Sequence, residues 1–222
     1  MEYHRDPKIS ERLFRFCPRF DDLTTTERID CCDTCDRFFA RCCHHEEIVC
    51  HFHAFVFVDG ACPGNRRPGA RAGIGCALGT RAEDQLAITV TEAMDPGAPR
   101  TSQRAELLAA LEGLHFLVGA ERKYHVGSRA HLKSKDPERE FIVVTDSEYV
   151  VKGMTEWMPY NNWRTQQGRV PANLDLFQRL DAAVAQYESQ GIKIQFFHVR
   201  RELNSIADGL AKRAAAESSI AF

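Results

Sequence analysis

Two apolar stretches of this chain end in an aspartate, and this feature constrains the fold most strongly. Phe55–Val58 is followed by Asp59 and Gly60, and the stretch FIVVT, residues 141–145, is followed by Asp146. Short runs of aromatic and β-branched side chains are typical of buried strands. The ordinary explanation of Asp59 is the start of a turn, because Asp-Gly is a strong turn signal. Burial of a carboxylate is costly unless the charge is paired or binds a metal ion, so a functional site is the other interpretation.

The remaining segments predict a mixed α/β fold. Strands are expected at residues 53–58, 72–80, 84–93, 141–147 and 192–199, and helices at 102–119, 147–158, 174–191 and 204–218. Glycine-rich turns separate the first three strands, which we expect to be antiparallel, and residues 120–140 are expected to form a loop. Later strands alternate with helices. This order predicts a mixed sheet with helices on both faces.

Four acidic residues occupy comparable places in this pattern. Asp59 and Asp146 end strands, whereas Glu106 and Asp208 lie near the starts of helices. Each has an ordinary alternative as a turn residue, a helix cap or a solvated residue near a helix N-terminus. If the first and fourth strands are neighbours, Asp59 and Asp146 lie side by side, and each raises the pKa of the other unless a cation separates them. A cluster of carboxylate oxygens is the kind of site that Mg²⁺ prefers.

These stretches and three others resemble the type 1 ribonuclease H family. The matching motifs are FVFVDGACPGN, TSQRAELLAALEGL, FIVVTDSEYVVKGM, NNWRTQQGRVPANLDLFQRL and HVRRELNSIADGLAKRAA, in the family's order over about residues 54–217. The resemblance implies an α/β, ribonuclease H-like fold, with a five-stranded mixed sheet (three strands antiparallel, two parallel) and helices on both faces. It implies an endonuclease that hydrolyses the RNA strand of RNA–DNA hybrids by a two-metal-ion mechanism. The alternative is a non-catalytic or weakly active nucleic-acid-binding module on the same fold.

The resemblance also implies roles for individual residues. The catalytic and metal-binding carboxylates fall on Asp59, Glu106, Asp146 and Asp208, which are expected to bind two Mg²⁺ or Mn²⁺ ions. Substrate contacts are expected for Asn65, Ser102, Gln103, Arg104, Trp163 and Arg164. Contacts to the 2′-OH are what distinguish RNA from DNA. Capping and turn chemistry is the alternative for Asn65 and Gln103, and packing is the alternative for Trp163.

The sequence departs from the family before its last helix. Many members carry a mobile histidine in this loop, and His198 stands ten residues before Asp208. We expect His198 on the fifth strand, because FFHV is typical of a strand, and Arg201 or Glu202 in the vacant position. A role of His198 as the family histidine is the alternative.

The first 52 residues have no counterpart in this resemblance. Eight of the nine cysteines lie at or before residue 62. We expect a Cys/His-rich extension over residues 1–52 and a catalytic domain over residues 53–218. A tetrahedral zinc site needs four ligands, and free thiols are the alternative. The candidate zinc ligands are Cys32, Cys35, Cys42, Cys43, His44 and Cys50.

Composition limits the partners and the compartment. The formal net charge of −2 weakens the case for a partner held by overall electrostatic attraction alone, although a local basic surface remains compatible with it. No apolar run reaches the roughly 18 residues that a membrane span needs, and the N-terminus has no signal-peptide pattern. We therefore expect an intracellular monomer, in the nucleus or the cytoplasm, that binds RNA–DNA hybrids.

Overall fold

The computed structural model describes residues 11–41, 51–67, 69–127, 140–157, 163–165 and 167–217. Its strands are β1 (Ile29–Cys31), β2 (Phe38–Ala40), β3 (His53–Ala61), β4 (Gly73–Ala77), β5 (Gln85–Thr89), β6 (Glu140–Thr145) and β7 (Lys193–His198). Its longer helices are α1 (Ser102–Gly127), α2 (Glu148–Lys152), α4 (Leu174–Glu188) and α5 (Ser205–Ala216). Short helical turns are η1 (Pro18–Phe20), η2 (Ala82–Asp84), η3 (Gly153–Trp157) and η4 (Arg201–Asn204).

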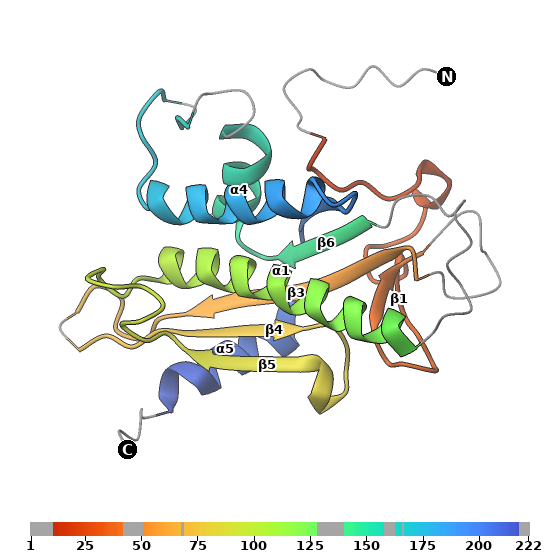
Figure 1. Ribbon diagram of the computed structural model, residues 1–222, viewed down its shortest axis with the longest axis horizontal. Coiled ribbons are helices and arrows are strands. Elements are labelled where there is room, and N and C mark those ends of the chain that lie inside the picture. Colours follow the sequence, from red (N-terminus) through yellow and green to blue (C-terminus); the bar gives the residue numbers. More distant parts are fainter. Residues whose placement is uncertain are drawn as a thin grey trace.

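The strands form one mixed, seven-stranded sheet (Figure 1). β3 pairs with β4 and β4 with β5, both antiparallel. β6 lies parallel to β3, and β7 lies parallel to β6. These five strands are the three antiparallel and two parallel strands that the sequence predicted, so the expected fold class is confirmed. β1 and β2 are additions to it.

β1 and β2 form an antiparallel hairpin from the N-terminal extension. Phe39 of β2 pairs with Ala54, in the part of β3 that precedes its pairing with β4. The Phe38 N–H donates to the Leu78 carbonyl at 2.8 Å, so the hairpin also meets the chain that follows β4. Strands of three residues are too short to show an alternating pattern, which explains why the sequence did not predict them.

The start of the described chain lies along β7. Leu13 forms a parallel bridge with Phe196, the Phe14 N–H donates to the Phe196 carbonyl at 3.0 Å, and the Phe196 N–H donates to the Arg12 carbonyl at 2.7 Å. The buried Phe14 ring packs edge-on against Phe55 of β3, with 5.6 Å between ring centroids. The described part of the extension therefore contacts the sheet both at β3 and at β7.

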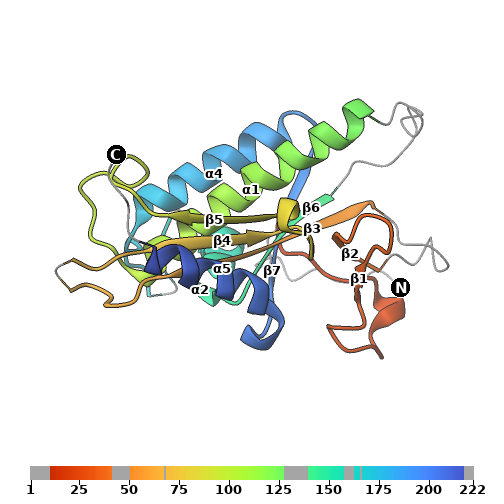
Figure 2. The same ribbon diagram turned by 90° about the horizontal axis from the view of Figure 1, so that it is seen from below.

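Helices cover both faces of the sheet (Figure 2). α1 and α4 pack on one face, and α5 packs on the other. Gly73 and Gly75 of β4 point toward α5: a Cβ atom at either position would lie 2.3 Å from α5 backbone, at Ala215 N or Ala207 O. The absence of side chains at these two positions, together with the alanines of α5, lets this helix lie close to the strand.

α1 is longer than its apolar pattern predicted. It continues to Gly127, through residues expected to begin a loop. Ala120 to Lys123 are good helix formers, and buried Glu121 accepts from Arg37 Nη1 at 3.2 Å, which ties this part of the helix to the extension. In the part of the chain that the structure describes, no helix combines the length and the apolar character that a membrane crossing requires.

Candidate active site

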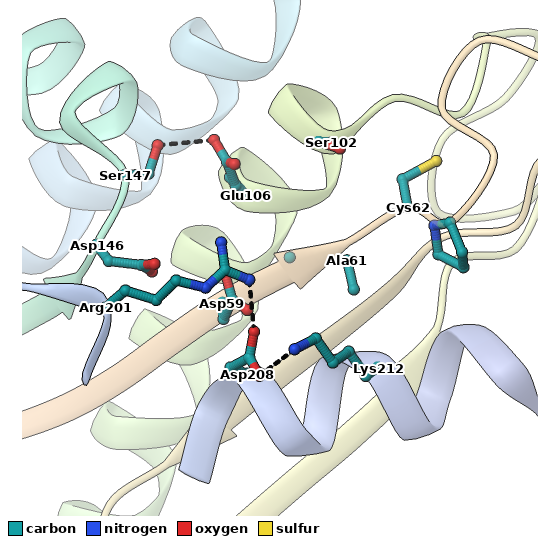
Figure 3. A pocket seen from close by; sticks show the side chains of 12 residues that line it. Asp59, Ala61, Cys62, Ser102, Glu106, Asp146, Ser147, Arg201, Asp208 and Lys212 are labelled. Atoms are coloured by element: carbon teal, nitrogen blue, oxygen red, sulfur yellow. Dashed lines mark hydrogen bonds and ion pairs between the residues drawn. The ribbon is translucent and has the colours of Figure 1, made fainter. Parts of the chain in front are cut away.

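Four acidic side chains from different elements line one cavity (Figure 3). Asp59 belongs to β3, Glu106 to the second turn of α1 and Asp208 to the first turn of α5, while Asp146 directly follows β6. Because β3 and β6 are parallel neighbours, their carboxyl ends meet at one edge of the sheet, which places Asp59 near Asp146. The cavity has a volume of about 540 Å³. The structure thus brings together the four carboxylates predicted as catalytic and metal-binding residues.

Gly60 determines how closely α1 approaches Asp59. A Cβ atom on Gly60 would lie 2.2 Å from Ala105 C and from Glu106 N, well inside van der Waals contact. The first turns of α1 therefore pack directly on the backbone that follows Asp59, and this contact sets the position of Glu106. The Asp-Gly pair that suggested a turn in the sequence is instead part of strand β3.

Replacement of Gly60 by alanine is expected to displace the start of α1 and with it Glu106. The overpacking should lower the free energy of unfolding by about 1–3 kcal/mol. It should also reduce the rate of the hybrid hydrolysis expected from the sequence by more than the stability change explains. Gly119→Ala is the matched control, because no atom lies within 4 Å of a Cβ added there and alanine favours a helix. Urea unfolding and initial rates of both variants test this, and an unchanged rate in Gly60→Ala would show that α1 is not positioned by this contact.

Burial and neighbouring negative charge disfavour the ionisation of Asp59 and Glu106. Burial, followed by the charge of Asp146, raises the pKa of Asp59 to about 6. Burial also raises the pKa of Glu106, and the charges of Asp59 and Asp146 act in the same direction. The Ser147 hydroxyl, which donates to Glu106 Oε2 at 2.7 Å, opposes this rise. A site that holds carboxylates against this penalty stores a free energy that a bound cation relieves.

The metal-free protein is expected to become more stable as the pH falls from 7.5 toward 5. The folded-state pKa of Asp59, about 6, is above its ordinary value of 3.8, so the folded state binds this proton more tightly than the unfolded state. The stabilisation therefore appears as the pH falls through 6, and its size is about 1–3 kcal/mol. Unfolding in EDTA at several pH values should show this slope in the wild type and a smaller slope in Asp59→Asn. Identical slopes would contradict the raised pKa.

Asp208 is the carboxylate that is paired with basic side chains. Arg201 Nη2 donates to Asp208 Oδ1 at 2.8 Å, and Lys212 Nζ donates to Asp208 Oδ2 at 2.6 Å (Figure 3). Partial burial opposes ionisation, but the hydrogen bonds from Lys212 and Arg201 hold the pKa of Asp208 below its ordinary value. Arg201 and Lys212 are themselves largely exposed, so two cationic groups stand at the rim of the cavity.

Asn204 is a site residue that the sequence analysis missed. It is fully buried, and its Nδ2 donates to Asp146 Oδ1 at 2.8 Å and to the Val58 carbonyl at 2.9 Å. The side chain thus links the residue before Asp59 to Asp146 and orients the latter. An asparagine directly before a helix usually caps it, but the Asn204 side chain makes no capping bond to α5. Its position in the sequence therefore indicates a cap and does not indicate its contact with Asp146.

Ser102 and Asn65 lie together at the start of α1. Ser102 lines the cavity, and its N–H donates to Asn65 Oδ1 at 3.3 Å. The helix cap is Thr101, whose hydroxyl accepts from the Arg104 N–H at 3.2 Å. The Ser102 side chain is therefore available to the cavity, while Asn65 bonds to the first helical N–H.

Arg104 is placed differently from the expectation that it contacts substrate. It is buried, and its Nη2 lies 2.5 Å from Asp95 Oδ1 and 2.7 Å from Asp175 Oδ2. Its Nη1 donates to the other oxygen of Asp175 at 3.0 Å and to Asn173 Oδ1 at 3.3 Å. Successive helix residues are rotated by about 100°, so Arg104 and Glu106 point to different sides of α1. Arg104 therefore joins α1 to the start of α4 and does not line the cavity.

The other expected substrate residues also lie outside the cavity wall. Trp163 is half-buried and packs against the main apolar core, which agrees with the packing alternative for this residue. Arg164 is exposed and donates from Nη1 to the Gly168 carbonyl at 3.0 Å. Gln103 is half-buried at the start of α1. Any contact between these side chains and a substrate must therefore lie outside the carboxylate cavity.

His198 lies on the fifth strand of the predicted sheet, as expected. It is the last residue of β7 and pairs with Thr145, directly before Asp146. Its side chain is exposed and does not line the cavity. Of the two residues expected in the vacant position, Arg201 lines the cavity and contacts Asp208, whereas Glu202 is exposed and does not line it.

The expected zinc ligands fall partly outside the described residues. Cys32 and Cys35 are described, whereas Cys42, Cys43, His44 and Cys50 lie in a range that the structure does not describe. Sulfur atoms of Cys32 and Cys35 and a ring nitrogen of His51 lie within 4.8 Å of one another. His51 was not among the expected ligands, although it directly follows Cys50, which was one of them.

Comparisons with known proteins agree with this geometry. The family model for RNase H matches residues 52–216. The ribonuclease H of Afipia carboxidovorans is 34% identical over 171 residues, covering 75% of this chain and 95% of that protein. The ribonuclease H of Dinoroseobacter shibae is 37% identical over 166 residues, covering 73% and 90%. The solved N-terminal RNase H domain of rv2228c from Mycobacterium tuberculosis, a fusion with maltose binding protein, is 22% identical with a TM-score of 0.46, covering 73% of this chain and 98% of that one. The expected family is confirmed: the chain is an enzyme that belongs to the ribonuclease H family.

Proposed function

We propose that this protein hydrolyses the RNA strand of RNA–DNA hybrids as an endonuclease with two divalent metal ions, Mg²⁺ or Mn²⁺. The observation that carries the proposal is the convergence of Asp59, Glu106, Asp146 and Asp208 on one cavity, in a chain of the ribonuclease H family.

The carboxylate cavity has the donor chemistry that two magnesium ions need. Hard divalent cations take oxygen ligands, and the four carboxylates offer eight oxygen atoms from rigid strand ends and helix starts. The raised pKa of Asp59, caused by burial and by Asp146, is relieved when positive charge enters the site. Bound metal ions of this kind supply an activated water and neutralise the departing 3′-oxygen of a phosphodiester.

Basic side chains at the rim suit a polyanionic substrate. Arg201 and Lys212 lie beside Asp208 and are exposed, so these basic side chains attract phosphate groups toward the carboxylates. Among the described residues, Arg201 and Lys212 are the basic side chains that line this cavity, so binding should depend on a small number of phosphate contacts and weaken as the salt concentration rises.

The start of α1 supplies the polar groups that can distinguish RNA from DNA. The Ser102 hydroxyl faces the cavity, and Asn65 is held beside it through the Ser102 N–H. A ribose 2′-OH both donates and accepts hydrogen bonds, as do a serine hydroxyl and an asparagine amide. We assign recognition of the RNA strand to this pair.

The test is cleavage of an end-labelled RNA–DNA hybrid, with duplex RNA and duplex DNA as controls. We expect internal cuts in the RNA strand of the hybrid with Mg²⁺ or Mn²⁺, none in EDTA, and little or no cleavage of either control duplex. Binding of the hybrid without cleavage in either metal would overturn the proposal and support the alternative of a nucleic-acid-binding module. Equal cleavage of duplex RNA would contradict the assigned substrate.

A further inference from the structure

We propose that Cys32, Cys35 and His51 bind one zinc ion, which fastens the turn between β1 and β2 to the chain that leads into β3. The site is separate from the carboxylate cavity, and neither cysteine nor the histidine lines that cavity. It is not needed for the proposed reaction, and its experiment can fail without affecting that proposal.

The distances suit a tetrahedral zinc site. The three candidate ligand atoms all lie within 4.8 Å of one another, and Cys35 Sγ is 4.0 Å from His51 Nε2. Zinc bonds of ~2.3 Å to sulfur and ~2.0–2.1 Å to nitrogen place tetrahedral ligand atoms about 3.5–3.8 Å apart. Shifts well below the length of one bond therefore close the site. Water or another side chain can take the fourth position.

The turn already presents its sulfur atoms to backbone donors. The N–H groups of Cys35 and Thr34 donate to the Cys32 sulfur. The Arg37 N–H donates to the Cys35 sulfur in the same way. Amide hydrogen bonds of this kind stabilise thiolates, which are the form of cysteine that binds zinc.

The backbone of the turn is shaped and anchored without metal. Asp36, directly after Cys35, has a φ of 54°, and its N–H donates to the Cys32 carbonyl at 2.6 Å. Arg37 Nη2 lies 2.7 Å from the buried Asp84, which ties the turn to η2. This left-handed residue lies directly after Cys35, where the chain turns from β1 toward β2.

An aromatic contact holds His51 in place. Its ring stacks on the buried Phe39 of β2, with 4.1 Å between centroids and an interplanar angle of 5°. Phe39 in turn pairs with Ala54 of β3. A stacked ring has little freedom to rotate, so its Nε2 stays directed at Cys35. Free thiols in a loosely packed segment require no stacked histidine beside them, so this arrangement favours a bound ligand.

Two sulfur donors and one imidazole select zinc over magnesium. Thiolates are soft ligands that bind zinc, whereas Mg²⁺ prefers carboxylate oxygens. The chain therefore holds two metal sites of different chemistry: an oxygen site for the reaction, and a sulfur–nitrogen site on the additional strands. His51 lies two residues before β3, which carries Asp59 at its other end.

Elemental analysis of the full-length protein, after dialysis that removes loosely bound metal, tests the site. We expect about one zinc per chain in the wild type and at least a ~10-fold loss in His51→Ala and in Cys35→Ser. Cys31→Ser is the matched control, since this exposed neighbour should leave the zinc content unchanged. Asp146→Asn should also retain zinc, which separates this site from the carboxylates.

Cobalt substitution and thermal melting give independent readouts. Co²⁺ should produce sulfur-to-metal charge-transfer absorption in the wild type and in Cys31→Ser, and none in Cys35→Ser. Added zinc should raise the melting temperature of the zinc-depleted wild type but not that of His51→Ala. Absence of zinc with freely titratable thiols, a Cys32–Cys35 disulfide detected by mass spectrometry, or full zinc content in His51→Ala would each overturn the proposal.

Discussion

Replacement of Asp146 by asparagine is expected to reduce hydrolysis of an RNA–DNA hybrid by at least ~10²–10³-fold while leaving the fold intact. The side chain stands at the carboxyl end of β6, beside Asp59 in the cavity, and asparagine has nearly the same shape. Its amide oxygen can still accept the hydrogen bond that Asn204 Nδ2 now donates at 2.8 Å. The variant therefore removes one negative charge from the proposed metal ligands and little else.

Initial rates over a range of Mg²⁺ concentrations, together with a thermal melt in EDTA, measure this effect. Asp22→Asn is the matched control, because Asp22 is exposed, does not line the cavity and should leave the rate unchanged. Activity of Asp146→Asn within a few-fold of the wild type would mean that this carboxylate is not a metal ligand. A large loss of thermal stability would show that Asp146 has a structural role instead.

Replacement of Arg104 by methionine is expected to produce the largest loss of stability. The guanidinium lies between Asp95, which is 2% exposed, and Asp175, with contacts of 2.5 and 2.7 Å. Removing one partner of a buried ion pair leaves an uncompensated charge, which costs about 3–5 kcal/mol. Arg100 Nη1, 3.5 Å from Asp95, relieves part of this cost. A loss of about 3 kcal/mol in the free energy of unfolding corresponds to a fall in melting temperature of about 6–12 °C.

Lys152→Met is the control for this prediction. Lys152 forms an exposed ion pair with Glu148 at 2.6 Å, one helical turn away, and solvent-exposed pairs of this kind contribute little to stability. Melting curves and the KM for the hybrid should be measured for both variants. An unchanged melting temperature in Arg104→Met, with a raised KM, would restore the original expectation that Arg104 contacts the substrate.

Much of the catalytic centre was predictable from the sequence, because its parts follow local rules. Apolar runs mark β3 and β6, and the residues after such runs in parallel neighbours must meet at one sheet edge. Asp59 and Asp146 therefore meet for reasons that are visible in the chain itself. Glu106 and Asp208 follow from their places near the starts of amphipathic helices, once the resemblance indicates which ends of those helices face the sheet edge.

The tertiary structure decided which polar residues serve the site and which serve the fold. Arg104 stands two residues from Glu106, yet its partners Asp95 and Asp175 lie 9 and 71 positions away in the sequence. Asn204 likewise contacts Asp146 from 58 positions away, and His51 lies near Cys35 from 16 positions away, with its ring stacked on Phe39. A hydrogen-bonding side chain carries no mark of its distant partner, because that partner is selected by how the sheet and helices pack. The sequence by itself therefore determined the five strands of the predicted sheet, their order and the four carboxylates, and packing alone determined the partners that hold them.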